Sequence, residues 1–204
     1  VVRQNAVAVI GKVQSRKGLQ ALIRKSQENI DGSSWKVRRD VATLLGAYYS
    51  PEATNALIAM LAEAHAEVRT AAFDQLAKGD RLFDDAQVQR IGALVRSPLA
   101  GIPTRAVILL SQANTVGSIA IVTGLTDPSL KKELQLEVVA GLGAVDGEST
   151  TTLLISFLAD DDAPVRALAE AALNTRTLNA AQLTLLAPVL ANADVGVRQL
   201  AVKQ

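Results

Sequence analysis

The sequence contains no cysteine and a single histidine, His65, among its 204 residues. Without cysteine there is no disulfide, no thiol nucleophile and no thiolate metal ligand. One histidine cannot build the paired-histidine site of a zinc or iron enzyme. Neither a Gly-x-Ser-x-Gly elbow nor a phosphate-binding glycine loop is present, and no apolar run approaches the roughly 18 residues that span a bilayer. These absences predict a protein that is not an enzyme, holds no metal or cofactor and crosses no membrane.

Apolar residues make up 49% of the chain and are mostly Ala, Leu and Val. They follow the pattern Val-Arg-x-x-Ala-x-x-x-Leu, which recurs in seven registers, beginning near residues 2, 37, 68, 102, 134, 165 and 197. Positions four and eight residues into each register share one face of a helix, and a second apolar helical segment precedes every register after the first. Units of about 32 residues therefore contain two helices and short turns. The sequence predicts an all-α fold, an α-solenoid of about six helix pairs that runs as a single array over residues 1–204.

The repeat resembles a known family in its turn and second helix. Residues 160–169 (DDDAPVRALA) resemble this element of a HEAT-like repeat, in the short form found in phycobilin lyase-type HEAT proteins, and residues 37–46 and 67–69 are similar. The resemblance implies a right-handed, armadillo-like superhelix whose second helices line a concave surface. It also implies a polar ladder between neighbouring repeats, formed here by Arg3, Arg38, Arg69, Asp160, Arg166 and Arg198. Pro103 and Gln135 replace the arginine at the fourth and fifth registers, so we expect the ladder to be interrupted there.

The two ends of the sequence carry a further expectation about the array. The chain begins Val1-Val2-Arg3, and both ends stop at a second helix without an evident polar cap. We therefore expect a fragment of a longer solenoid, in which flanking repeats of the parent chain cover the ends.

Charge and aromatic residues are unevenly distributed along the chain. Residues 1–40 carry nine bases and three acids, or +6, whereas the remaining residues carry 12 bases and 17 acids, or −5. An anionic partner could be steered to the first repeats, although a merely solvated surface explains the same charges. Tryptophan, tyrosine and arginine are frequent interface anchors. The candidate partner-binding residues are Trp35, Lys36, Arg39, Asp40, Tyr48, Tyr49 and Arg105.

Two isolated features have simpler explanations than a catalytic or metal-binding role. His65 lies in a turn before a register, where we expect a solvated loop side chain. The acidic run at residues 160–162 lacks the spaced oxygen ligands of a calcium loop and is better explained by helix capping and ladder contacts.

Three functions remain open on these observations. The leading hypothesis is a non-enzymatic scaffold that binds a protein or peptide partner on its concave face. The second is binding of nucleic acid or another polyanion through the basic N-terminal repeats. The third, a component of a chromophore (bilin) lyase, is implied only by the repeat subtype.

Overall fold

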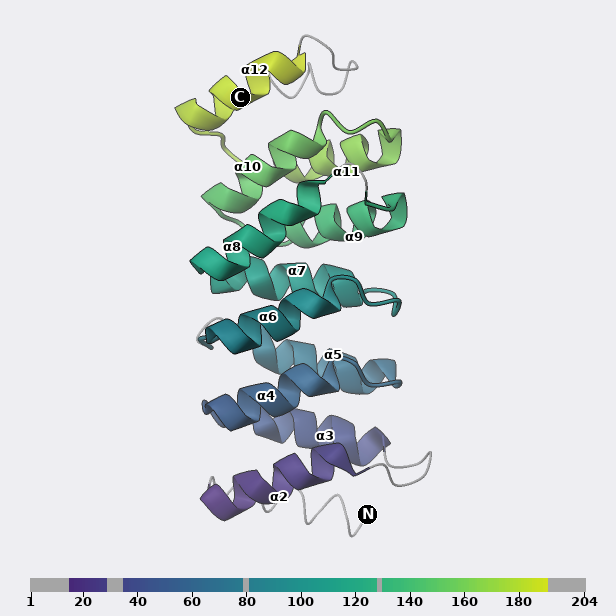
Figure 1. The fold of residues 1–204 in the computed structure, drawn as a ribbon, viewed down its shortest axis with the longest axis vertical. Helices are drawn as coiled ribbons and strands as arrows, with labels where there is room; N and C mark the ends of the chain where they lie inside the picture. The colour runs from purple at the N-terminus through teal and green to yellow at the C-terminus, as the bar shows by residue number, and fades with distance from the viewer. Residues whose placement is uncertain (1–14, 29–34, 79–80, 128–129, 191–204) are drawn as a thin grey trace. The chain divides into compact units, whose positions relative to one another are not determined.

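A computed structural model describes residues 15–28, 35–78, 81–127 and 130–190 of the chain (Figure 1). Over these ranges it contains eleven α-helices, one short 3₁₀ helix and no strand. First helices alternate with second helices along the chain (Figure 1). The predicted fold class, an all-α solenoid of HEAT-like helix pairs, is confirmed. None of the described helices is long and apolar enough to cross a membrane.

The helices fall into two sets, the first and the second helix of each pair. The first helices are α2 (Arg16–Gln27), α4 (Pro51–Met60), α6 (Asp85–Leu94), α8 (Val116–Thr123), α10 (Glu148–Phe157) and α12 (Ala180–Leu190). The second helices are α3 (Trp35–Leu45), α5 (Ala66–Leu76), α7 (Ile102–Ala113), α9 (Lys132–Gly143) and α11 (Ala163–Leu173), and the 3₁₀ helix η1 (Gly124–Thr126) follows α8. The registers near residues 37, 68, 102, 134 and 165 each lie within a second helix, whereas those near residues 2 and 197 fall outside the described residues.

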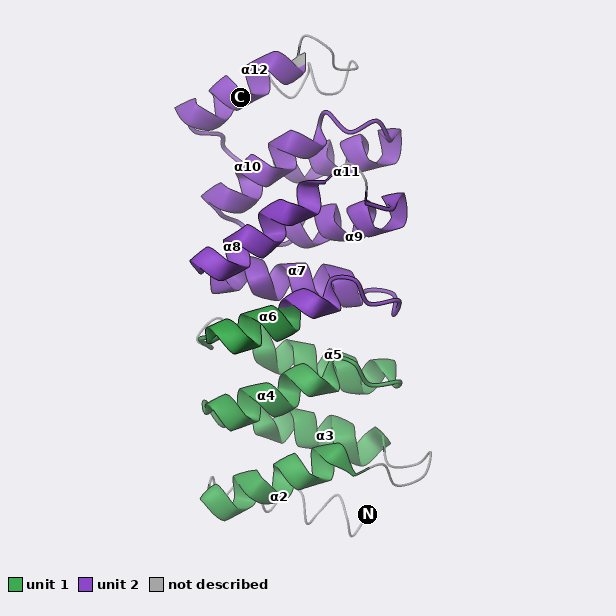
Figure 2. Cartoon of the chain, viewed as in Figure 1, with its two compact units in different colours: residues 1–91 green, residues 92–204 purple. Residues whose placement is uncertain are grey.

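The chain divides into two compact units, residues 1–91 and 92–204, with the boundary inside α6 (Figure 2). In unit 1, α3 packs on α5 and α2 packs on α4. In unit 2, α9 lies between α7 and α11, while α10 contacts α12. Each unit is thus built by stacking one helix pair on the next, as expected for repeats that bury their apolar faces only on their neighbours.

Local sequence signals set where several helices begin. Ser50 accepts a hydrogen bond from the backbone N–H of Ala53 at 3.3 Å, and Pro51 occupies the first turn, where its missing N–H costs nothing. Thr115 and Ser118 form a reciprocal capping box at the start of α8. Gly101 precedes α7 with φ of 75°, a left-handed conformation that glycine adopts readily.

Repeat residues of the second helices form the core. In α5 and α11 the valine of the register and the leucine eight positions later are almost fully buried, as Val68 and Leu76 and as Val165 and Leu173. Helices α7 and α9 approach especially closely, because a Cβ atom on Gly141 would lie 2.8 Å from the carbonyl oxygen of Thr104. A glycine at position 141 therefore permits close packing of α9 on α7.

Candidate protein-interaction surface

Trp35 opens α3 and lies at one edge of unit 1. Its ring stacks on that of His65, the N-cap residue of α5, with centroids 5.6 Å apart and an angle of 23° between the planes. The Nζ atom of Lys36 lies 5.6 Å from the centroid of the Trp35 ring, within the range of a cation–π contact. We name Trp35, Lys36 and His65 the Trp35 patch. His65 is thus half-buried against an aromatic ring, whereas the sequence suggested only a solvated loop residue.

Arg39 and Asp40 continue the partly exposed face of α3. Their side chains pair with each other, with Arg39 Nη2 2.8 Å and Nε 3.1 Å from Asp40 Oδ1. The arginine side chain is 44% exposed and the aspartate side chain 30% exposed, so both charges are accessible to a partner. A partner would meet a compensated charge pair here rather than a net positive surface.

Tyr48 and Tyr49 differ sharply in their surroundings. Tyr48 is 8% exposed and belongs to the core, so its side chain is not available to a partner, whereas Tyr49 is 60% exposed. The guanidinium carbon of Arg81 lies 4.8 Å from the centroid of the Tyr49 ring. Arg105 is half-buried on α7 and belongs to unit 2.

Arg81 has a structural role that the sequence pattern did not reveal. Its buried guanidinium donates to the carbonyl oxygens of Gly46 and Tyr48 at 3.1 Å each, and to Thr54 Oγ1 at 2.8 Å. It therefore caps the C-terminal end of α3, in the preceding repeat, where helix carbonyl groups lack partners. Burial lowers the pKa of Arg81, and Tyr49 opposes this shift.

Arg176 performs the same task in unit 2. Its guanidinium donates to the carbonyl oxygens of Leu142 (2.8 Å), Gly143 (3.2 Å) and Val145 (2.9 Å) at the end of α9. It also donates to Thr150 Oγ1 at 3.1 Å and Thr151 Oγ1 at 2.9 Å. An arginine that follows one second helix thus holds the end of the preceding second helix in both units.

The residues expected to form the ladder make two kinds of contact. Arg38 is 7% exposed, and its Nε lies 3.2 Å from Glu63 Oε1 in the next repeat. In unit 2 the corresponding acid is Asp160, which pairs with Lys132 Nζ at 2.8 Å. Arg69 and Arg166 instead bond within their own repeat, to carbonyl oxygens of the turn that precedes their helix. Arg3 and Arg198 lie outside the described residues.

The ion pair between Lys132 and Asp160 perturbs the pKa of both partners. Burial raises the pKa of Asp160, but hydrogen bonds from Lys132 and from the Asp162 backbone N–H outweigh it and hold the pKa below its usual value. The hydrogen bond to Asp160 raises the pKa of Lys132.

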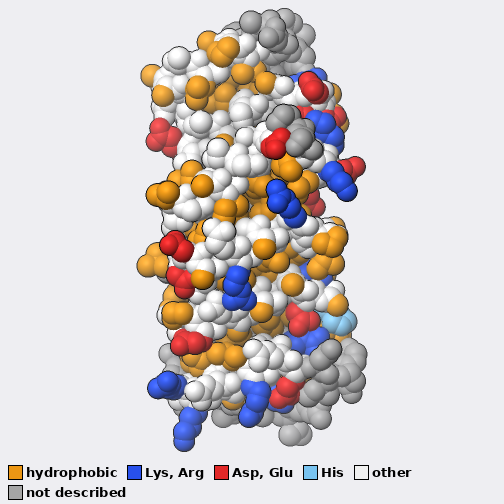
Figure 3. Space-filling view, viewed as in Figure 1, with side chains coloured by type: hydrophobic (Ala, Val, Ile, Leu, Met, Phe, Trp, Pro, Cys, Tyr) orange, Lys and Arg blue, Asp and Glu red, His pale blue; other side chains and the backbone are white. Residues whose placement is uncertain are grey.

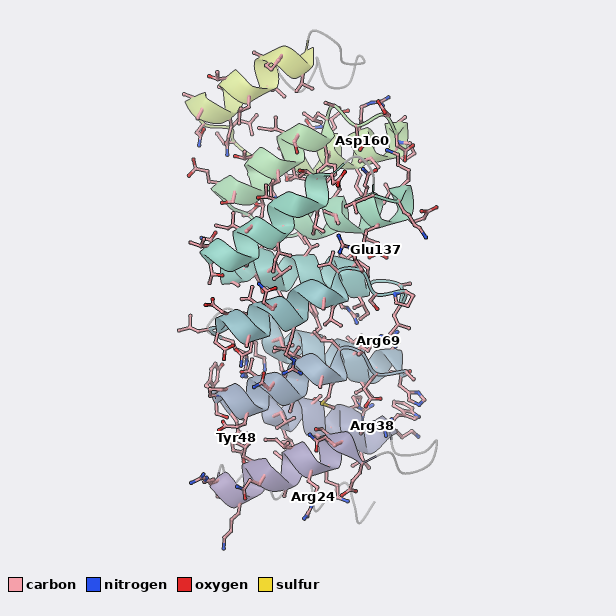
Figure 4. The ribbon with its side chains drawn as sticks, viewed as in Figure 1. Arg24, Arg38, Tyr48, Arg69, Glu137 and Asp160 are labelled. Carbon is pink, nitrogen blue, oxygen red and sulfur yellow. The ribbon has the colours of Figure 1, made fainter. Side chains whose placement is uncertain are left out.

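In unit 1, Figure 4 shows Arg38 and Arg69 at the same edge and Tyr48 at the opposite edge.

A different contact joins α7 and α9, where the register arginine is absent. Gln135 takes the position of the arginine in α9 and is buried. Two residues further on, Glu137 accepts hydrogen bonds from the backbone N–H groups of Gly101 (3.0 Å) and Thr104 (3.2 Å) and from the Thr104 hydroxyl. Burial raises the pKa of Glu137, but these hydrogen bonds outweigh it and leave the pKa lowered. A carboxylate at the N-terminus of α7 thus links the two repeats.

Two grooves open between these elements. The larger, about 1160 Å³, lies in unit 1 between α2, α4 and the turn that contains His65, and its wall includes Arg38 and Glu63. The smaller, about 590 Å³, lies in unit 2 between the turn before α7 and the start of α9. The described residues contain no group of three or more histidine and acidic side chains placed to hold a metal ion.

The stacked helix pairs and their cross-repeat contacts define a helical-repeat solenoid, a class that commonly uses its extended surface for binding. Residues 1–78 match the family model of HEAT repeats, which confirms the predicted resemblance to HEAT-like repeats. No curated protein matches the sequence.

Several solved structures are similar to this chain. The complex of CpcE and CpcF of phycocyanin lyase from Nostoc sp. PCC7120 is 22% identical, with a TM-score of 0.49 over 90% of this chain and 74% of that chain. A designed armadillo repeat protein in complex with the peptide (KR)4 is 15% identical, with a TM-score of 0.47 over 90% of this chain and 96% of that one. Human deoxyhypusine hydroxylase is 16% identical, with a TM-score of 0.36 over 98% of this chain and 94% of that chain.

Proposed function

We propose that this chain is a non-enzymatic scaffold that binds a protein or peptide partner on the face formed by its second helices, the concave face in HEAT-like repeats. The observation that carries the proposal is the Trp35 patch, where an aromatic ring and a lysine lie at the surface beside the accessible Arg39–Asp40 pair. Arg105 is the candidate contact in unit 2.

The arrangement of the Trp35 patch favours binding for a physical reason. Stacking on His65 restricts the Trp35 ring before any partner arrives. A restricted aromatic side chain loses little conformational entropy on binding and still buries a large apolar area. Tyr49, held under Arg81, offers a second restricted ring, so the proposal uses Tyr49 rather than the buried Tyr48.

Capture of a co-purifying partner by this chain tests this proposal. We expect Trp35→Ala and Arg39→Glu each to reduce capture at least fivefold, because Trp and Arg anchors typically contribute more than about 1 kcal/mol. Gln89→Glu is the matched control, because it adds a negative charge on the exposed surface of α6, a first helix. Equal capture by the wild type and both contact variants would refute the proposed surface.

The charge of α2 supports a second candidate function, polyanion binding. Its twelve residues contain Arg16, Lys17, Arg24 and Lys25 and no acid, and basic side chains gather over this helix in Figure 3. Glu28 offsets part of this charge, because its carboxylate lies 4.0 Å from Arg24 Nε and also pairs with Lys25.

A salt titration distinguishes polyanion binding from the scaffold function. If α2 binds the phosphates of single-stranded DNA, the logarithm of affinity should fall linearly with the logarithm of salt concentration, with a slope of about −0.7 per phosphate contacted. Arg16→Gln with Arg24→Gln should then reduce this slope by one to two contacts. A flat or absent response would remove polyanion binding and leave the scaffold proposal intact.

A further inference from the structure

Three turns between a first and a second helix begin with the same backbone hydrogen bond. They precede α5, α7 and α11, and in each a backbone N–H bonds to a carbonyl three residues earlier. The bonds run from Glu63 to Met60 at 3.3 Å, from Ser97 to Leu94 at 2.9 Å and from Asp160 to Phe157 at 3.2 Å. In each case the bonded N–H belongs to the residue six positions before the arginine position of the register. The three turns can therefore be compared at these positions, although α7 begins two residues later, relative to this bond, than α5 and α11 do.

An arginine side chain completes two of these turns. Arg69 Nη1 donates to the carbonyl oxygens of Glu63 and Ala64, both at 2.7 Å. Arg166 Nη1 donates to the carbonyl oxygens of Asp160 at 2.8 Å and Asp161 at 3.0 Å. The guanidinium thus satisfies the carbonyl groups six and five residues before it, which the turn itself leaves without donors.

Proline replaces the arginine at the third turn. Pro103 has neither a side-chain donor nor a backbone N–H. The carbonyl oxygens that correspond to those bonded by Arg69 and Arg166 belong to Ser97 and Pro98, and they accept no hydrogen bond from the described part of the chain. A groove of about 590 Å³ opens at this turn, and Ser97, Pro98 and Pro103 line it. We name it the Pro103 groove.

The remaining walls of the Pro103 groove suit a long side chain that ends in donor groups. Leu99, Leu130 and Leu134 supply apolar contacts for the methylene groups of such a side chain. Glu133 is exposed and lines the same groove, so its carboxylate is available to a cation. Glu137 also lines the groove, but its oxygens already accept the N–H groups at the start of α7.

Two cations lie in the wall of the same groove. Arg96 and Lys131 are both exposed and solvated. They would favour a carboxylate ligand, and neither side chain donates a hydrogen bond to the carbonyl oxygens of Ser97 or Pro98 within the described residues. The repeat comparison therefore favours a hydrogen-bond donor as the ligand.

We propose that the Pro103 groove binds an arginine side chain of a partner protein or peptide, whose guanidinium takes the place that Arg69 and Arg166 take in the other two turns. The inference rests on the proposed scaffold function in one respect, namely that a partner supplies the arginine. The groove is distinct from the Trp35 patch, which belongs to the other unit.

The sharpest test is a variant whose own side chain occupies the Pro103 groove. Pro103→Arg should place a guanidinium in the groove from within the chain, as in the other two turns. The control Ala171→Arg adds the same charge on the exposed surface of α11. The probe is the acetylated, amidated tripeptide Leu-Arg-Leu, with Leu-citrulline-Leu and Leu-Glu-Leu as comparisons. Backbone amide shifts of the full chain report where each peptide binds.

We expect Leu-Arg-Leu to shift the amides of Leu99, Gly101 and Leu134 and to bind at least fivefold more tightly than the citrulline peptide, because charged hydrogen bonds are about twice as strong as neutral ones. Pro103→Arg should abolish these shifts, Ala171→Arg should preserve them, and Glu133→Gln should weaken binding about threefold. Should Pro103→Arg fail to fold by circular dichroism, Leu134→Trp narrows the groove from the opposite wall and should also abolish the shifts.

Three results would overturn the assignment. One is equal binding of Leu-Arg-Leu by the wild type and a folded groove-filling variant. Another is a preference for Leu-Glu-Leu that disappears in Arg96→Ala with Lys131→Ala. The third is the absence of shifts at the groove with millimolar peptide. None of these depends on whether Trp35→Ala affects partner capture, so the groove and the proposed contact surface can fail separately.

Discussion

Arg176→Ala should destabilise unit 2 far more than the loss of an exposed charge would. The guanidinium donates five hydrogen bonds, three of them to carbonyl oxygens at the C-terminal end of α9, and its side chain is only 6% exposed. Alanine would leave these carbonyl oxygens and two threonine hydroxyls without this donor. Water can reach them only through the space that the side chain vacates.

The size of the effect follows from these contacts. A buried group that loses its hydrogen-bond partner costs about 1–3 kcal/mol, and removing one partner of a buried charged network costs about 3–5 kcal/mol. We expect the free energy of unfolding to fall by about 3–4 kcal/mol, because Thr150 and Thr151 keep the hydrogen bonds that their hydroxyls donate to backbone carbonyl oxygens. Arg176→Lys should restore less than half of this loss, since one ammonium group cannot reach acceptors spread over both helix ends.

Urea unfolding followed by circular dichroism measures the change. Repeat arrays can unfold in more than one step, so the unfolding slope must be compared between variants before a free energy is assigned. Arg90→Ala is the control, because this arginine is exposed and bonds only to Asn55, and it should cost less than about 1 kcal/mol. A loss below 1 kcal/mol for Arg176→Ala, or full recovery by lysine, would refute the capping role.

Three further outcomes are expected from packing, titration and fluorescence. Gly141→Ala should destabilise unit 2 by about 1–3 kcal/mol in urea unfolding, because its Cβ would meet the backbone of α7, whereas Gly124→Ala meets nothing within 4 Å and should be neutral. Because the pKa of Glu137 is lowered on folding, its stabilisation is present above the unfolded pKa near 4.5 and is lost as the pH falls through the folded value. Glu137→Gln should therefore unfold more easily at pH 7 and approach the wild type in acid. His65→Ala should change the emission of Trp35, the single tryptophan, without altering the circular dichroism.

The sequence was sufficient to predict the helices and their core faces. Apolar residues recur in one register because every second helix buries the same face against its neighbours, so periodicity alone locates α5 or α11 and identifies Val68 and Leu76 as core residues. The same pattern marks Pro103 and Gln135 as departures from the register. The pattern did not predict which contact between the repeats replaces that of the missing arginine.

The contacts made by Arg81 and Arg176 could not be predicted from the repeat. Arg81 lies 13 residues after Val68, whereas Arg176 lies 11 residues after Val165, so the two arginines occupy no common aligned position. Their equivalence appears only in space, because loops of different length bring each guanidinium to the end of the preceding second helix. The sequence identified Trp35 and Lys36 as candidate contacts but not the stacking of His65 on Trp35, since the two rings are 30 residues apart in the chain.

Proline in place of the register arginine at residue 103 changes the contact between α7 and α9 and leaves the Pro103 groove unfilled. Between α3 and α5, and again between α9 and α11, an ion pair joins the turn edge while an arginine caps the opposite edge. Between α7 and α9 the link at the turn edge is the Glu137 carboxylate, which caps backbone N–H groups and not carbonyl groups. A carboxylate cannot donate to the turn, so the oxygens of Ser97 and Pro98 keep their capacity to accept a hydrogen bond. The loss of the register arginine at Pro103 is therefore compensated at the start of α7 but not within the turn, where the proposed guanidinium of a partner would donate to the two carbonyl oxygens.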